Sequence, residues 1–127
     1  MDAASLTPSG LQRDSDAFEV HRPATDRVTG LVFCSPHSGS IYPEDMHSDL
    51  DETRLRSVED AAMDRLIASG MSAGATLLLA RYGRAYVDLN RAETDLDPAL
   101  IADCPFDQPT PKTIAGYGVL HRVSGDG

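Results

Sequence analysis

The stretch Leu31-Val32-Phe33-Cys34-Ser35-Pro36-His37-Ser38-Gly39 is a short apolar run that ends in a proline, a histidine and a glycine. Residues 31–35, bounded by Gly30 and Pro36, have the length and composition of a buried β-strand. Open α/β sheets bind their ligands just beyond the carboxyl ends of their strands. The pattern therefore predicts that His37 lies beside a ligand cleft.

The segments that follow predict an α/β fold. From Ser57 the apolar residues recur at helical spacings of three and four, and Gly70 with Gly74 ends this pattern. Ser57 and Asp60 also match a capping box at the start of the helix. Residues 75–80 are a second apolar run of strand length. This order predicts a right-handed parallel crossover, and hence a mostly parallel sheet with flanking helices.

Three further segments have strand-like patterns. Residues 17–21 alternate apolar and polar side chains, as a short exposed strand does, and residues 117–123 resemble another short strand. Residues 84–91 predict a third strand of the sheet, with apolar side chains on one face. Its other face would carry four polar side chains: Arg84, Tyr86, Asp88 and Asn90.

The length and composition indicate one globular domain. The chain has 127 residues, of which 41% are hydrophobic, and this is enough for one compact core. Small, polar and acidic residues prevail over residues 1–16, which we expect to be a flexible leader, followed by the domain over residues 17–127. Cys34 and Cys104 are expected to stay reduced, as is usual in a cytoplasmic protein.

The charge and the hydropathy narrow the range of partners. A formal net charge of −9 disfavours binding to nucleic acids and to anionic membranes, and an anionic substrate would need local arginines. No apolar run approaches the roughly 20 residues of a membrane-spanning helix, and the amino-terminal stretch has no signal-peptide core. We therefore expect a cytoplasmic protein that binds neither nucleic acid nor membrane.

His37 and the carboxylates near the predicted helix start are the first candidates for chemistry. His37 could bind zinc together with carboxylates and a second imidazole, or it could be a turn histidine that caps a nearby carbonyl. Asp60 lies at the edge of the apolar stripe of the predicted helix, where it could reach a cleft or simply cap the helix. Glu59 falls near the middle of the stripe, and Asp64 lies further out, where solvent would surround it.

Arg84 and Arg91 bracket the predicted third strand. Their planar guanidinium groups are suited to binding carboxylates through paired hydrogen bonds, which would serve a small anionic substrate. Alternatively, Arg91 pairs with Asp88 or another nearby acid, and Arg84 is solvated. The spacing leaves both possibilities open.

Several motifs together resemble one known family. They are Ser35-Pro36-His37-Ser38-Gly39, Tyr42-Pro43, Glu59-Asp60, Gly74-Ala75, Arg84 and Asp88-Leu89-Asn90-Arg91. In this order they resemble the N-formylglutamate amidohydrolase family over about residues 30–123. The combination of the P-H-S-G and D-L-N-R motifs is fairly specific, whereas either motif alone is weak.

The resemblance implies a hydrolase that depends on zinc or another divalent metal and has a zinc-exopeptidase-like (phosphorylase/hydrolase-like) α/β architecture. Such an enzyme cleaves the amide C–N bond of N-formyl-L-glutamate, or of a related anionic N-acyl amino acid, and the family acts in histidine degradation. Carried over by position, His37 and Asp60 resemble metal ligands, with Glu59 the alternative carboxylate. Glu59 and Asp64 are then candidate catalytic carboxylates. The substrate carboxylates would be held by Arg84, Asn90 and Arg91.

The chain also departs from the family pattern. Members of the family are longer and carry a later histidine in a D-x-H-S type motif, which His121 does not match. The resemblance therefore implies the amino-terminal part of such an enzyme, an incomplete domain that would need a carboxyl-terminal half or a second copy of the chain. The alternative is a non-catalytic remnant, or a module that binds a partner through an open sheet edge.

Overall fold

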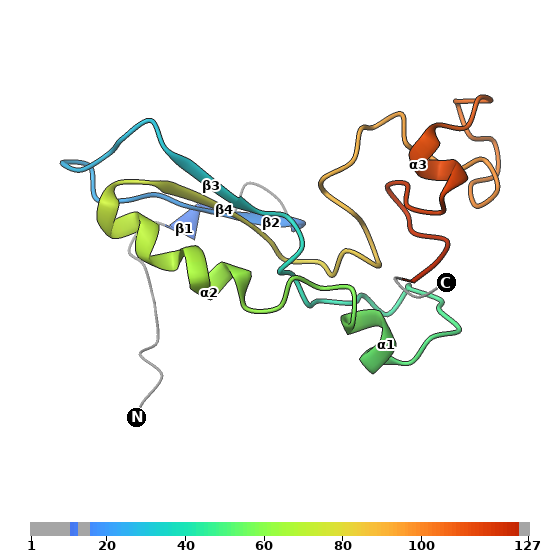
Figure 1. Cartoon of the computed structure of the whole chain (residues 1–127), viewed down its shortest axis with the longest axis horizontal. Coiled ribbons are helices and arrows are strands. Elements are labelled where there is room, and N and C mark those ends of the chain that lie inside the picture. The colour runs from blue at the N-terminus through green and yellow to red at the C-terminus, as the bar shows by residue number, and fades with distance from the viewer. Residues whose placement is uncertain (1–10, 13–15, 125–127) are drawn as a thin grey trace.

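The computed structural model describes residues 11–12 and 16–124, so most of the predicted leader lies outside the described residues. Figure 1 shows a sheet with helical turns beside it at one end of the molecule, and a small helix among loops at the other end. None of the helices in the described ranges has the length and apolarity needed to cross a membrane.

Four strands form one mixed sheet in the order β1-β2-β4-β3. Strands β3 and β4 pair in parallel, as the strand-helix-strand order predicts, whereas β2 pairs antiparallel with both β4 and β1. The α/β class is confirmed, but the prediction of a mostly parallel sheet is wrong. The reason is that residues 22–31 reverse the chain without a crossover helix, so β2 and β3 run in opposite directions. The strand bounds are Leu11–Gln12 for β1, Phe18–His21 for β2, Val32–Ser35 for β3 and Thr76–Ala80 for β4.

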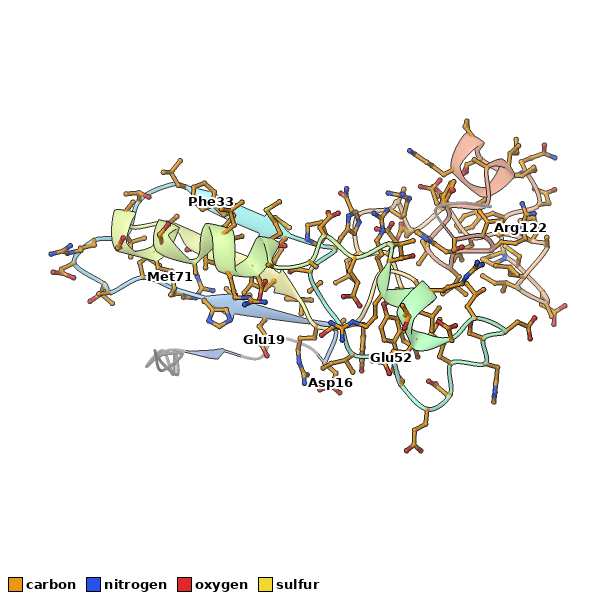
Figure 2. All side chains as sticks on the ribbon, turned by 60° about the horizontal axis from the view of Figure 1, so that its bottom comes forward. Asp16, Glu19, Phe33, Glu52, Met71 and Arg122 are labelled. Atoms are coloured by element: carbon orange, nitrogen blue, oxygen red, sulfur yellow. The ribbon has the colours of Figure 1, made fainter. Side chains whose placement is uncertain are left out.

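Strand β3 is an exposed edge strand and not the buried strand that its apolar run predicts. Val32 is 63% exposed and Phe33 is 39% exposed, while Ser35 is buried. The Phe33 ring lies close against Gly70 of the crossover segment, where a Cβ atom would collide with it (Figure 2). Because β4 lies between β2 and β3, the core of the sheet is centred on β4, where Leu77 is 2% exposed.

The predicted crossover helix is divided into three short segments. They are α1 (Glu52–Arg56), α2 (Met63–Ile67) and the 3₁₀-helix η1 (Ala68–Ala73). The N-cap of α1 is Asp51, whose carboxylate accepts a hydrogen bond from the Arg54 backbone N–H at 2.9 Å, and Ser57 is the C-cap. The predicted start at Ser57 and its capping box with Asp60 are therefore wrong.

The interruption between α1 and α2 has an identifiable cause. The Asp60 backbone N–H donates a hydrogen bond to the His37 carbonyl at 2.9 Å, so it cannot serve a continuous helical ladder. Ala62 then enters the left-handed region at φ 64°. The 3₁₀-helix η1 ends at Gly74, which has φ 87°. The glycine at this position predicts such an end.

Residues 84–91 form turns instead of the predicted third strand. The backbone N–H groups of Tyr86 and Val87 both donate to the Gly83 carbonyl, at 2.9 and 3.2 Å. This winding places Arg84 and Asp88 together as an i,i+4 ion pair. An alternating pattern is therefore also compatible with turns, and here the Asp88 N–H donates to the Val119 carbonyl at 2.8 Å.

The carboxyl-terminal region contains one short helix, α3 (Pro111–Ile114), whose N-cap is Thr110. Within the described residues, 117–123 contain a single β-bridge between Tyr117 and His121, so the predicted short strand there is wrong. Individual hydrogen bonds to residues 84–97 hold the segment instead. It thereby brings His121 to the turn that carries Asp88.

Candidate active site

The carboxylate of Asp88 is the centre of a buried polar cluster. Asp88 is 1% exposed, and groups from three separate segments contact its two oxygens. Oδ1 accepts from His37 Nε2 at 2.8 Å and from the Asn90 backbone N–H at 2.9 Å. Oδ2 lies 3.0 Å from His121 Nε2, 3.1 Å from Arg84 Nη2 and 3.2 Å from Arg91 Nη2.

These partners keep Asp88 ionised. Burial by itself raises the pKa of Asp88, but the hydrogen bonds from His121, the Asn90 backbone and His37 outweigh it and hold the pKa well below its usual range. An ionised carboxylate only accepts hydrogen bonds. Both histidines must therefore donate through Nε2, so that in each neutral imidazole Nδ1 is the unprotonated nitrogen.

His37 lies just beyond the carboxyl end of β3, as predicted, and its residue is 8% exposed. Gly39 permits the next segment to run against the backbone of Arg81 and Tyr82, which a Cβ atom would meet. The Ser35 and Ser38 hydroxyls form a hydrogen bond of 2.7 Å across the turn. The ring of His37 contacts two carboxylates, Asp88 and Asp60, and so it is more than a turn histidine that caps a carbonyl.

Asp60 faces the free nitrogen of His37. Its Oδ2 lies 3.4 Å from His37 Nδ1, and its side chain is 52% exposed. A carboxylate and an imidazole lone pair repel each other at this distance unless a cation lies between them, either a proton on Nδ1 or a metal ion. An imidazole nitrogen and a carboxylate oxygen are also the donor types that zinc takes.

The fit to a metal site is partial. Among residues 11–12 and 16–124 no group of three or more His, Cys, Asp or Glu side chains is placed to hold a metal ion. His37 and Asp60 supply two side chains of the types that bind zinc.

Contacts with neighbouring side chains hold the Glu59 carboxylate within the fold. Its side chain is 3% exposed and accepts hydrogen bonds from the Tyr42 hydroxyl at 2.8 Å and from Arg56 Nε at 3.4 Å. Burial and the Glu59 hydrogen bond raise the pKa of Tyr42 well above its usual range. Asp64 lies half-buried on α2, and in the described part of the chain no hydrogen bond joins it to His37. The structure thus brings neither carboxylate to the His37–Asp60 pair, and their catalytic roles stay predictions.

Two of the three residues predicted to hold substrate carboxylates, Arg84 and Arg91, are engaged within the chain. Arg91 donates to the Tyr117 carbonyl at 2.7 Å and the Asn90 carbonyl at 2.8 Å, besides its ion pair with Asp88. The pairing of Arg91 with Asp88 that the sequence left open is therefore present. Arg84 also pairs with Asp88, so it is not simply solvated, and among the described residues its buried Nε has no hydrogen-bond partner. The Asn90 residue is exposed, and its part in substrate binding stays a prediction.

Sequence reasoning missed the central position of Asp88 and the contribution of His121. An aspartate between two arginines in the D-L-N-R region was a signal for a buried, paired carboxylate. His121 offered no comparable signal, because it is 33 residues from Asp88 and only tertiary contacts bring it there.

The family model for N-formylglutamate amidohydrolase matches residues 29–127, which contain every residue of the cluster. The chain belongs to the N-formylglutamate amidohydrolase family. No match was found among curated proteins. The motif resemblance over about residues 30–123 is thus confirmed.

One solved structure similar to this member of the N-formylglutamate amidohydrolase family is the N-formylglutamate amidohydrolase from Ralstonia eutropha JMP134. The two chains are 37% identical with a TM-score of 0.73, and the match covers 83% of this chain. It covers 38% of the Ralstonia eutropha chain, so the matched part of this chain spans well under half of that protein's length.

Proposed function

We propose that this chain provides the His37–Asp60 part of a metal-dependent amidohydrolase site that cleaves the amide C–N bond of N-formyl-L-glutamate or a related N-acyl amino acid. The observation that carries the proposal is the pair of facing acceptors, His37 Nδ1 and Asp60 Oδ2, 3.4 Å apart. Membership of the N-formylglutamate amidohydrolase family supports the substrate class. The zinc-exopeptidase-like architecture, cytoplasmic location and role in histidine degradation belong to the same proposal.

Zinc is the metal that the donor set favours, and another divalent ion is the alternative. When bound, zinc polarises an amide carbonyl and lowers the pKa of a water molecule. The chain's own contribution is to hold His37 in the correct tautomer, because Asp88 accepts from Nε2 at 2.8 Å. Asp60 is the better candidate than Glu59 for the carboxylate ligand, since Glu59 is engaged by Tyr42 and Arg56.

Substrate binding and proton transfer complete the proposal. Arg84, Asn90 and Arg91 would hold the substrate carboxylates with the N–H groups that their internal contacts leave over. A carboxylate near the site would pass a proton from water to the leaving amine, and Glu59 and Asp64 are the candidates.

Zinc binding by the purified 127-residue chain tests the metal part. We expect one zinc per chain, lost in Asp60→Ala and kept in the matched control Asp64→Ala. Equal zinc binding by both variants would overturn the assignment of Asp60.

The substrate is tested in a chimaera in which this chain replaces the matched segment of the Ralstonia eutropha protein. Formate release from N-formyl-L-glutamate is expected, and His37→Ala should abolish it. A folded, zinc-loaded chimaera that releases no formate from N-formyl-L-glutamate or from other N-formyl amino acids would contradict the proposed reaction.

A non-catalytic module that binds a partner is the second candidate. The observation that favours it is the exposed apolar edge at β3, where Leu31 is 53% exposed and Val32 is 63% exposed. In that case the chain would form a dimer or another complex through this edge, whether or not it binds metal.

A further inference from the structure

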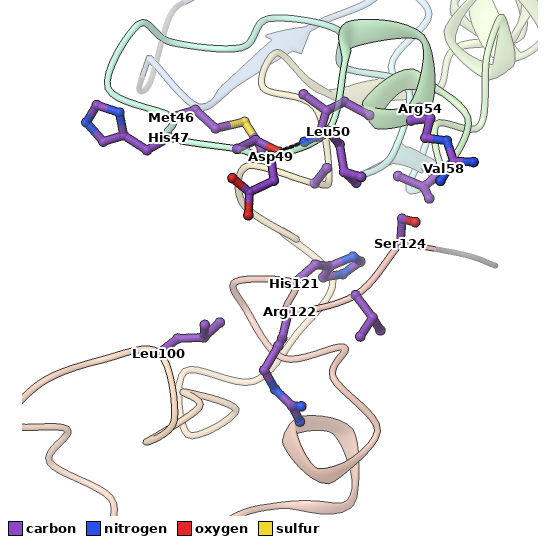
Figure 3. A pocket seen from close by; sticks show the side chains of 14 residues that line it. Met46, His47, Asp49, Leu50, Arg54, Val58, Leu100, His121, Arg122 and Ser124 are labelled. Carbon is purple, nitrogen blue, oxygen red and sulfur yellow. Dashed lines mark hydrogen bonds between the residues drawn. The ribbon is translucent and has the colours of Figure 1, made fainter. Parts of the chain in front are cut away.

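A pocket of about 450 Å³ lies between residues 46–58 and the carboxyl-terminal segment 121–124 (Figure 3). This volume is typical of sites for small molecules. Neither His37 nor Asp60 lines it. The pocket is therefore distinct from the proposed metal pair, although His121 lines it and also contacts Asp88, which contacts His37.

His121 lines the pocket. Its side chain is only 5% exposed, and its Nε2 donates to Asp88 at 3.0 Å. Among the described residues no hydrogen-bond partner is found for Nδ1. Because Nε2 is directed at the Asp88 carboxylate, Nδ1 is the ring nitrogen left for a ligand, and its lone pair in the Nε2–H tautomer can accept a ligand N–H.

Arg54 is the cation available to a ligand carboxylate. Its guanidinium has no ion-pair partner within the part of the chain that the structure describes, whereas Arg122, which also lines the pocket, pairs with Asp97 at 3.0 Å. Asp49 also lines the pocket, and Figure 3 shows the Arg54 and Asp49 side chains pointing in different directions from the same wall. A carboxylate placed near Arg54 can thus avoid Asp49.

The rest of the lining combines apolar side chains with the polar residues His47, Ser48 and Ser124. The larger aliphatic side chains that line the space are Leu50, Leu55, Val58, Leu100 and Val123. A ligand that fills the pocket should therefore combine one carboxylate, one N–H donor and an aliphatic group.

We propose that this pocket binds a small N-acyl amino acid with an aliphatic side chain, separately from the His37–Asp60 pair. The amide N–H donates to His121 Nδ1, the carboxylate pairs with Arg54, and the side chain lies among the aliphatic residues. The site is independent of metal, since none of these three contacts involves a proposed metal ligand.

The test uses the 127-residue chain in the presence of a metal chelator, titrated calorimetrically with N-acetyl-L-leucine. We expect saturable binding that Arg54→Gln weakens by about tenfold or more, the usual size of a charge-assisted hydrogen bond. The matched control is Arg65→Gln, an exposed arginine on α2 that does not line the pocket, and it should bind as the wild type does. N-acetyl-L-leucinamide, which lacks the carboxylate, should bind weakly and equally to all three proteins.

The contact with His121 is measured by NMR without substituting that residue. On adding N-acetyl-L-leucine, the ¹⁵N resonance of His121 Nδ1 should shift, whereas 4-methylpentanoate, which lacks the amide, should leave it in place. Absence of binding, an unmoved Nδ1 resonance, or equal weakening by Arg54→Gln and Arg65→Gln would overturn the proposal.

Asp60→Ala separates this proposal from the proposed hydrolase function. That variant loses the metal pair but leaves the pocket lining intact, so it should bind N-acetyl-L-leucine as tightly as the wild type. Binding that requires zinc or Asp60 would overturn the separate site. A chain that binds no zinc but still binds the ligand would overturn only the metal proposal.

Discussion

His37 Nε2 lies 2.8 Å from Asp88 Oδ1, although the two residues are 51 positions apart in the sequence. This contact joins the turn after β3 to the turn of residues 84–91 and determines which nitrogen of His37 faces Asp60. It is therefore a structural contact and, in the proposed function, a positioning contact as well.

Replacing Asp88 with asparagine should destabilise the protein strongly. The variant leaves Arg84 and Arg91 without their shared carboxylate and puts an amide N–H₂ among N–H donors. Removing one partner of a buried ion-pair network costs about 3–5 kcal/mol of unfolding free energy, which urea denaturation measures. The Asp60 side chain is 52% exposed, so Asp60→Asn should change the unfolding free energy by less than about 1 kcal/mol. If Asp88→Asn lowers the unfolding free energy as little as Asp60→Asn does, Asp88 is not the centre of the cluster.

Acid should destabilise the protein through the same carboxylate. The pKa of Asp88 is lowered in the folded state, so its contribution to stability is complete above the unfolded pKa of about 3.9 and is lost as the pH falls towards the folded pKa. The Ala99 backbone N–H and Arg122 also lower the pKa of Asp97. Protonation of Asp97 at low pH should therefore destabilise the protein as well. Urea midpoints should be steady from pH 7 to pH 5 and fall below about pH 4. The urea midpoint of Asp88→Asn should fall less steeply with decreasing pH than that of the wild type. An unchanged slope would contradict the assignment of this pH dependence to Asp88.

Tyr42→Phe should separate the structural role of Glu59 from the proposed ligand role of Asp60. The variant removes the hydroxyl that donates to the Glu59 carboxylate at 2.8 Å and leaves Arg56 as the side-chain donor to that buried group within the described part of the chain. We expect a loss of about 1–3 kcal/mol in unfolding free energy, with zinc affinity unchanged. A large loss of zinc affinity at unchanged stability would indicate instead that Glu59 is the metal-binding carboxylate.

Gly74→Ala should be costly for two reasons. The residue has φ 87°, and a Cβ atom there would collide with the Arg27 carbonyl. We expect at least about 1 kcal/mol of destabilisation in thermal or urea unfolding. Gly30→Ala is the matched control, because a Cβ there meets nothing within 4 Å, and it should be neutral or slightly stabilising. Equal effects of the two substitutions would show that the turn at Gly74 tolerates a side chain.

The sequence by itself determined the local features of this protein. Two apolar runs joined by a helical pattern predicted strands β3 and β4 and their parallel pairing, and a glycine predicted the end of η1. The position of His37 after β3 also followed from the sequence, because strand length and proline act over a few neighbouring residues. The motifs around it were sufficient to predict the family, since they preserve the order of the site residues.

Only the tertiary structure decided how the segments meet. The exposure of β3 depends on its place at the edge of the sheet, which its own apolar run cannot encode. The helix is interrupted because the Asp60 N–H bonds to the His37 carbonyl, and local propensity does not include this bond. Asp88 gathers His37 and His121 from 51 and 33 residues away. Burying a carboxylate is favourable only where several donors converge on it, so that convergence is a property of the folded chain and not of any one segment.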